Sequence, residues 1–200
     1  MRHTIPLITA AALAACSGCV TRTMTNTPRT ALEQLLLSGA VDAALAKFQL
    51  PRLAGQKVFI HFADLKSVDA EYVKVATRAH FAKLGAVLVD KSDAADLTAE
   101  VASGGLGTEF KTGALGIPPI PMPGSPVAFP ELPIFKQVEQ TGIFKLLIFV
   151  HRGGKFVASG LFYAKCDRSE SFLLFFRFVT TDDVREGWEK HDRINKALAG

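Results

Sequence analysis

Seven of the ten prolines in this 200-residue chain lie within residues 117–133. Proline has no backbone N–H and a fixed φ, so such a stretch can be neither a helix nor a central strand. A connection this long is uncommon inside a compact domain unless it is functional or disordered. Its apolar side chains argue against a freely solvated linker. We therefore predict that it packs along the surface or contacts a partner through Ile117, Ile120, Met122, Val127 and Phe129.

The chain ahead of the proline cluster has the periodicities of alternating helices and strands. Leucines and alanines recur at helical spacing over about 28–48, and either Pro28 or the capping box Thr30-x-x-Glu33 can start this helix. The next strand, helix and strand together have the size of a βαβ unit. The elements expected there are a strand over 57–63, a helix over 68–84 capped by Ser67, and strands over 86–90 and 97–102.

The last third of the chain predicts strands followed by one helix. The expected elements are strands over 142–151, 156–163 and 171–180 and a helix over about 183–198. Arg152-Gly153-Gly154-Lys155 is typical of a hairpin turn, and Asp183-x-x-Glu186 of a capping box. Because the run 142–151 is apolar on both faces, it predicts a central strand covered by helices rather than a membrane-spanning strand. The packing stripe expected on the last helix is Val184, Trp188, His191, Ile194 and Leu198.

These elements predict one α/β (α+β) domain, with a mixed sheet of about six strands covered by about three helices. The composition agrees with a folded domain, because 48% hydrophobic and 21% charged residues exclude a disordered chain. Three cysteines are too few for a disulfide scaffold. The formal net charge is +4 and the lysines and arginines form no run, so the sequence does not favour a nucleic-acid partner.

The N-terminus has the features of a bacterial signal peptide. A short basic start precedes an apolar run over residues 5–15, which is far shorter than the roughly 20 residues of a transmembrane helix. The run ends in Leu13-Ala14-Ala15-Cys16, which resembles the lipobox, whose cysteine carries diacylglycerol. Two or three acyl chains anchor a protein stably. We expect a lipoprotein signal peptide over 1–15, a lipidated tether over 16–26 and a periplasmic domain over 27–200.

The neighbours of Cys16 refine this expectation. Cys19 also follows small residues and is a rival lipidation site, although a cysteine rather than a leucine stands three residues before it. Ser17 replaces the aspartate that would follow Cys16 in an inner-membrane lipoprotein, and by resemblance to lipoproteins of Gram-negative bacteria this favours the outer membrane. With Cys16 acylated, Cys19 and Cys166 could form a disulfide; a buried, unpaired Cys166 is the alternative.

We find no residue pattern that predicts a catalytic, cofactor or metal site. The glycines of 104–107 lack the helix and the Gly-Lys-Ser/Thr that a phosphate loop needs, so they predict a bulged strand end. The histidines lack metal-binding spacing, and the aspartates of 90–96 lack the glycine and terminal glutamate of an EF-hand loop. An enzyme would need acidic side chains in a cleft beside one of His61, His80 and His151.

Short segments along most of the mature chain carry a further signal. They are Thr27-x-Arg29-Thr30-x-x-Glu33-Gln34-Leu35-Leu36-Leu37-Ser38, Leu53-x-Gly55-x-Lys57-Val58-Phe59, Leu88-Val89-Asp90-Lys91, Ala95-Asp96, Gly116-Ile117-Pro118 and Pro130-Glu131-Leu132-Pro133. Together they resemble a family of uncharacterised bacterial lipoproteins, known as a domain of unknown function. A lipobox followed by strand, helix and two strands is also similar, at the level of fold, to periplasmic domains of the curli secretion lipoprotein.

The sequence thus predicts an outer-membrane lipoprotein that faces the periplasm, is held by the lipid on Cys16, and needs no cofactor. We expect a non-catalytic binding or envelope-assembly module with an envelope protein as its partner. Two alternatives stay open. An oligomeric secretion-channel component would need an amphipathic membrane hairpin, and a periplasmic enzyme would need convergent polar residues in one pocket.

Overall fold

The computed structural model describes residues 20–25, 30–50, 53–62, 65, 69–121, 123–124, 128–174 and 176–199. The described elements, in chain order, are β1 (Val20–Thr25), α2 (Ala31–Leu45), β2 (Lys57–His61), α3 (Ala70–Lys83), β3 (Val87–Val89), the 3₁₀ turn η2 (Ser92–Ala94), β4 (Leu97–Ile117), β5 (Ile120–Pro121), β6 (Ala128–Phe129), β7 (Leu132–Arg152), β8 (Lys155–Leu173), β9 (Phe176–Asp182) and α4 (Asp183–Ala199). The expected signal peptide, Cys16 and Cys19 lie outside the described residues.

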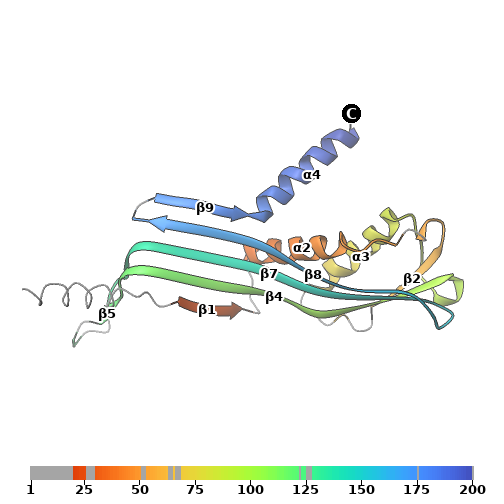
Figure 1. Ribbon diagram of the computed structural model, residues 1–200, viewed down its shortest axis with the longest axis horizontal. Helices are drawn as coiled ribbons and strands as arrows, with labels where there is room; N and C mark the ends of the chain where they lie inside the picture. The colour runs from red at the N-terminus through yellow and green to blue at the C-terminus, as the bar shows by residue number, and fades with distance from the viewer. Residues whose placement is uncertain are drawn as a thin grey trace, which may run out of the picture.

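The strands form one mixed sheet in the order β3-β2-β4-β7-β8-β9, and β1 pairs with the far part of β4. Strand β2 runs parallel to both β3 and β4, whereas β4, β7, β8 and β9 form an antiparallel meander. Helices α2 and α3 lie on one face of this sheet (Figure 1). The described chain therefore has the α+β fold with a mixed sheet and three helices that the sequence predicts.

The length of the strands sets the shape of the molecule. Strands β4 and β7 each have 21 residues, about 70 Å at 3.3 Å per residue, whereas strands of five or six residues are typical. Helices α2 and α3 cover only part of this length (Figure 1). We call the end with the β7–β8 turn the core end, and the end with the β8–β9 turn and the proline-rich connection the tip.

The hydrophobic core lies between α2, α3 and one face of the sheet, which we call the helix-side face. On β7, buried Phe144, Leu146 and Ile148 alternate with Lys145 and Leu147, which point to the opposite, open face. Leu147 is 42% exposed. The prediction that the run 142–151 is covered on both faces is therefore wrong, because the described helices α2 and α3 pack on one face only.

Helix α2 is seated directly on β7 at Gly142. A Cβ built at this glycine would lie 2.3 Å from the backbone oxygen of Leu36 in α2, a distance that two heavy atoms do not tolerate. Beside it, a Cβ at Gly39 in α2 would lie 2.7 Å from Sγ of Cys166 in β8. Glycines on both sides of the contact thus let the helix backbone approach the sheet closely.

The helix starts test three capping predictions. The capping box of α2 is present: Thr30 N–H donates to Glu33 Oε2 at 2.6 Å, and Glu33 N–H donates to Thr30 Oγ1 at 3.3 Å. The alternative start at Pro28 is wrong, because the helix begins at Ala31. Helix α3 has Asp69 as its N-cap residue, and Ser67 lies outside the described residues.

The start of α4 differs from the prediction. The Asp182 carboxylate accepts the Arg185 N–H at 3.1 Å and so caps the helix, whereas Asp183 accepts the Asp167 N–H at 2.7 Å and ties the helix to β8. The remainder of α4 projects away from the sheet (Figure 1). Of the predicted packing stripe, Val184 is buried but Trp188 is 60% exposed. The side chains of His191, Ile194 and Leu198 are not among those described.

Three further segments differ from the structure that the sequence predicts. Residues 103–116 continue β4 as far as Ile117, with a bulge between Ser103 and Gly105, because β1 and β7 supply hydrogen-bonding partners on both sides. Residues 20–25, expected within a polar tether, form β1. The segment 171–180 is not one strand: it turns at Leu174 and returns as β9.

Replacing Gly142 with alanine should lower the free energy of unfolding by about 1–3 kcal/mol, because the new methyl group forces α2 off the sheet. Gly107→Ala is the matched control, since a Cβ there meets nothing within 4 Å. Urea denaturation of both variants measures the difference. An equal loss at the two positions would show that close seating of α2 is not required.

Candidate functional site

Exposed apolar side chains gather at the tip of the sheet. One apolar row crosses the open face there. It is formed by cross-strand neighbours on β4, β7, β8 and β9, which are Leu115, Phe135, Leu173 and Phe176. Their exposed fractions run from 36% for Phe135 to 66% for Phe176. The other exposed large apolar side chains near this end are Ile117, Ile120, Leu132, Ile134, Leu174 and Phe178. We call these ten residues the apolar tip.

The two hairpin turns of the meander have opposite chemistry. At the core end, Gly153 and Gly154 take φ values of 51° and 80°, as a tight hairpin turn requires. At the tip, the pair Leu173–Phe176 closes a turn that contains Leu174. Leu174 has φ 51°, where a side chain costs about 1–2 kcal/mol relative to the right-handed region, and it is 62% exposed. Local folding preferences therefore do not explain an apolar turn here.

Substituting Leu174 with glycine should raise the free energy of unfolding by about 1 kcal/mol, since glycine adopts positive φ without the steric cost. Little burial is lost, because Leu174 is mostly exposed. Thermal or urea unfolding of the purified protein in detergent-free buffer measures the change. A destabilised variant would mean that the Leu174 side chain stabilises the fold itself.

A polar belt separates the apolar tip from the core end on the open face. The first row after the apolar row carries Gln137 and Ser171, with Phe178 of the apolar tip at its β9 edge, and the next row carries Lys111, Glu139 and Ser169. Gln137 donates to Glu139 at 2.9 Å, so neighbouring members of the belt are hydrogen-bonded to one another. The apolar tip is therefore bounded and does not continue along the open face.

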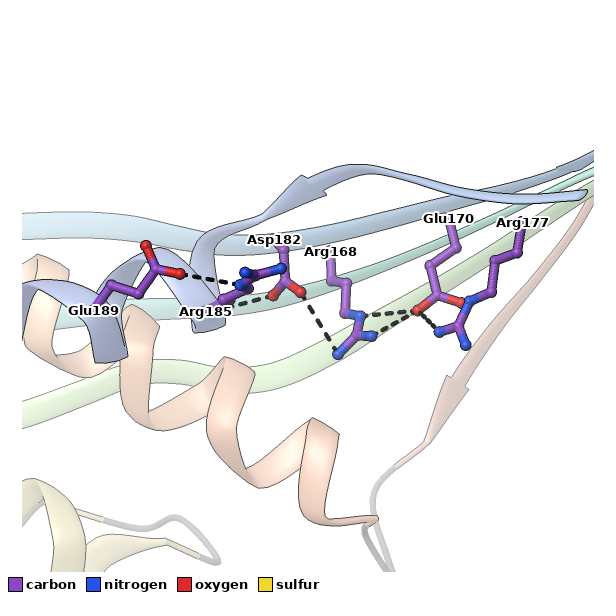
Figure 2. Close-up of polar contacts among 6 residues, drawn as sticks. All are labelled: Arg168, Glu170, Arg177, Asp182, Arg185 and Glu189. Atoms are coloured by element: carbon purple, nitrogen blue, oxygen red, sulfur yellow. Dashed lines mark hydrogen bonds and ion pairs between the residues drawn. The ribbon is translucent and has the colours of Figure 1, made fainter.

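An ion-pair network crosses the helix-side face behind the tip (Figure 2). Glu170 Oε1 on β8 accepts from Arg168 on the same strand, at 3.0 Å from Nε and 2.8 Å from Nη2, and from Arg177 Nη2 on β9 at 2.5 Å. Arg168 Nη1 lies 3.9 Å from Asp182 Oδ2, which joins the network to the first turn of α4. These contacts fasten β9, the edge strand, to β8.

The charge state of Glu170 couples this network to pH. Hydrogen bonds and charge from Arg177, then from Arg168, hold the pKa of Glu170 below its usual value, although partial burial opposes this shift. A carboxylate with a lowered folded-state pKa stabilises the fold above its unfolded pKa of about 4.3. That stabilisation is lost as the pH falls through the folded-state pKa.

Exchange of Glu170 for glutamine should therefore reduce stability by about 1–2 kcal/mol at neutral pH and by less in acid. The wild type should lose stability below about pH 4 by more than the variant does. Urea denaturation of both proteins at neutral and acidic pH measures how far the difference in their free energies of unfolding shrinks in acid. A difference between them that does not change with pH would rule out the charged network as its cause.

The N-terminal chain enters the fold near the apolar tip. In the antiparallel pairing of β1 with β4, Val20 lies opposite Gly113 and Thr25 lies opposite Thr108. Since Gly113 is two residues from Leu115, β1 begins beside the apolar tip and runs toward the core end. The residues before Val20 therefore join the described fold near the tip.

The predicted contact residues fall in part on this tip. Ile117 and Ile120 are each 51% exposed, as a contact surface requires. Met122 and Val127 lie outside the described residues, and for Phe129 only the backbone, in β6, is described. The sequence analysis did not predict the tip residues that come from β7, β8 and β9. A run of Leu and Phe without a turn residue, at 172–176, is the signal that could have found them.

Three of the five histidines, His61, His80 and His151, have described side chains. His80 Nε2 is 2.8 Å from the Phe48 backbone oxygen, beside the core. His151 Nε2 is 3.2 Å from Glu100 Oε1 on the open face, and His61 is exposed on the same face. No group of three metal-ligating side chains occurs among the described residues.

The other sites considered from sequence have structural roles. Asp96 accepts the Lys57 N–H at 2.9 Å, and Asp90 pairs with Arg78 at 3.1 Å, so these aspartates are engaged with neighbouring elements. Gly104 and Gly105 form the predicted strand bulge. Cys166 is a free thiol, 4% exposed, and burial together with nearby Asp183 and Asp167 raises its pKa to about 12. The pairing with Cys19 stays a prediction.

A small hollow lies between α2, α3 and β4. Its volume is about 240 Å³, and its lining includes Leu35, Ser38, Tyr72 and Leu106. The Tyr72 hydroxyl donates to the Asp42 carboxylate at 2.9 Å, and partial burial beside this carboxylate raises the tyrosine pKa. The hollow is below the usual size of ligand pockets, which begin near roughly 300 Å³.

Comparison of the chain with protein-family models and with curated proteins finds no match. The resemblance to a lipoprotein family and to curli secretion domains therefore gains no support from relatives and stays a prediction. Within the described residues, we find no helix that combines the length and the apolar character needed to cross a bilayer.

Proposed function

We propose that this chain is an outer-membrane lipoprotein, anchored through Cys16, that acts as a non-catalytic binding or assembly module in the periplasm. One observation carries the proposal: the apolar tip and the point where the N-terminal chain enters the fold lie at the same end of the sheet. The lipobox in Leu13-Ala14-Ala15-Cys16 supplies the anchor. The apolar tip supplies the contact surface.

Chain length supports this arrangement. Three residues separate Cys16 from Val20, so the two Cα atoms are four residue steps apart, and an extended chain spans at most about 3.6 Å per residue. The acylated cysteine is therefore within about 15 Å of the start of β1. A lipid on Cys16 holds the tip toward the membrane, and the core end, about 70 Å along β4, then points into the periplasm.

Binding rather than catalysis is favoured by the character of the exposed surface. Contiguous exposed apolar side chains mark sites of contact with proteins or membranes. Here such side chains come from four strands and converge at one end, opposite the glycine turn of β7–β8. The described pair His151–Glu100 lies instead on the open face and outside the lining of the hollow described above.

Mass spectrometry of the mature N-terminal peptide tests the anchor. We expect cleavage before Cys16 and a mass increased by two or three acyl chains. Cys16→Ser should abolish both the acylation and the attachment of processed protein to the membrane, whereas Cys19→Ser should leave both unchanged. Acyl groups on Cys19, or cleavage without any lipid, would contradict the proposal.

A further inference from the structure

We infer that the apolar tip is a lipid-docking surface, which inserts into the interface of the phospholipid bilayer that holds the acyl chains of Cys16. This inference rests on the proposed function, because the anchor brings the tip to the bilayer. It goes further by naming the partner of the tip, which is lipid rather than an envelope protein.

The outermost turn of the tip has the chemistry of a lipid-facing segment. Water-exposed hairpin turns favour Asn, Asp and Gly, as at Gly153-Gly154. The tip turn has Leu174 in the left-handed region with its side chain largely exposed. The Leu174 N–H donates to the Ile134 backbone oxygen at 2.9 Å, so this backbone donor is satisfied within the protein. An apolar side chain beside a satisfied N–H suits an apolar solvent.

The distance from the apolar row to the first polar groups matches the depth of the bilayer interface. The apolar row at Phe135 is followed two residues inward by the row of Gln137, and four residues inward by that of Glu139. At about 3.3 Å per residue, polar groups begin within about 7 Å of the apolar row. This matches the 5–10 Å to which interfacial segments enter the boundary of headgroups and acyl chains. The tip is therefore deep enough to dock on a leaflet.

Positive and negative side chains near the tip balance one another. The described charged side chains nearest the tip include both signs: Lys136 pairs with Glu131 at 3.5 Å, and Arg177 pairs with Glu170. Attraction to anionic headgroups is consequently not the driving force, and burial of apolar surface is. Docking should therefore persist in high salt, which screens surface charges.

The open face offers matched controls for an experiment. Leu132 at the tip and Leu161 on β8 are 60% and 61% exposed, and Phe176 at the tip and Phe156 on β8 are both 66% exposed. Leu161 lies opposite Leu147, twelve residues along β7 from Phe135, or about 40 Å. Each pair therefore has equal residue type and exposure and differs in distance from the tip.

The test uses the acylated protein purified from membranes, with Cys19→Ser, reconstituted into vesicles of phosphatidylethanolamine and phosphatidylglycerol. Leu132→Cys or Leu161→Cys carries an environment-sensitive fluorophore, and doxyl-labelled phospholipid is the quencher; Cys166 is buried away from the reagent. We expect quenching roughly threefold or more stronger at position 132, with a blue-shifted emission, in low and in high salt. Phe176→Asp should reduce that quenching, whereas Phe156→Asp should not.

The outcomes separate the two proposals. Equal, weak quenching at both positions in a protein whose Cys16 is acylated overturns lipid docking and leaves the anchor intact. Strong quenching at position 132 without acylation of Cys16 supports docking and overturns the anchor. If position 132 is shielded only in native membranes, where it crosslinks to a protein, the partner is a protein and the inference is wrong. Circular dichroism confirms that each variant is folded.

Discussion

The antiparallel pairing of β4 with β7 is the interaction on which the rest of this structure depends. It runs from the pair Thr98–His151 at the core end to the pair Ile117–Leu132 at the tip. Its first part carries the buried residues that pack against α2 and α3, and its second part extends past those helices. Without helices to cover it, the second part is held by its strand neighbours β1 and β8 and by side-chain contacts across the sheet.

The two ends of this ladder have different physical characters. At the core end, one face is buried against helices and the turn is made of glycines. At the tip, apolar side chains are exposed, and the arginine–glutamate network behind them fastens the edge strand β9. Because β1 begins beside the tip, an acyl chain on Cys16 and the exposed apolar side chains are directed to one end of the molecule. In the arrangement we propose, one end of the fold faces the membrane and the other faces the periplasm.

Local signals in the sequence predicted much of the fold. The Thr30–Glu33 capping box and the Gly153-Gly154 turn lie within a few residues of what they specify, and both are present. The glycine-rich extension of β4 was missed because its hydrogen-bonding partners, β1 and β7, are distant in sequence. The turn at Leu174 was missed because it contains no turn-forming residue. The apolar tip likewise arises only when the register aligns Leu115, Phe135, Leu173 and Phe176.

Hydrogen exchange at the two turns of the meander tests directly whether the tip faces the membrane. The acylated protein is compared in detergent-free vesicles and after release of its lipid-bearing N-terminus by proteolysis. We expect amides around Leu174 to exchange much more slowly on vesicles than after release, whereas those at Gly153 and Gly154 should exchange equally fast in both. Equal exchange around Leu174 in the two preparations would contradict a membrane-facing tip.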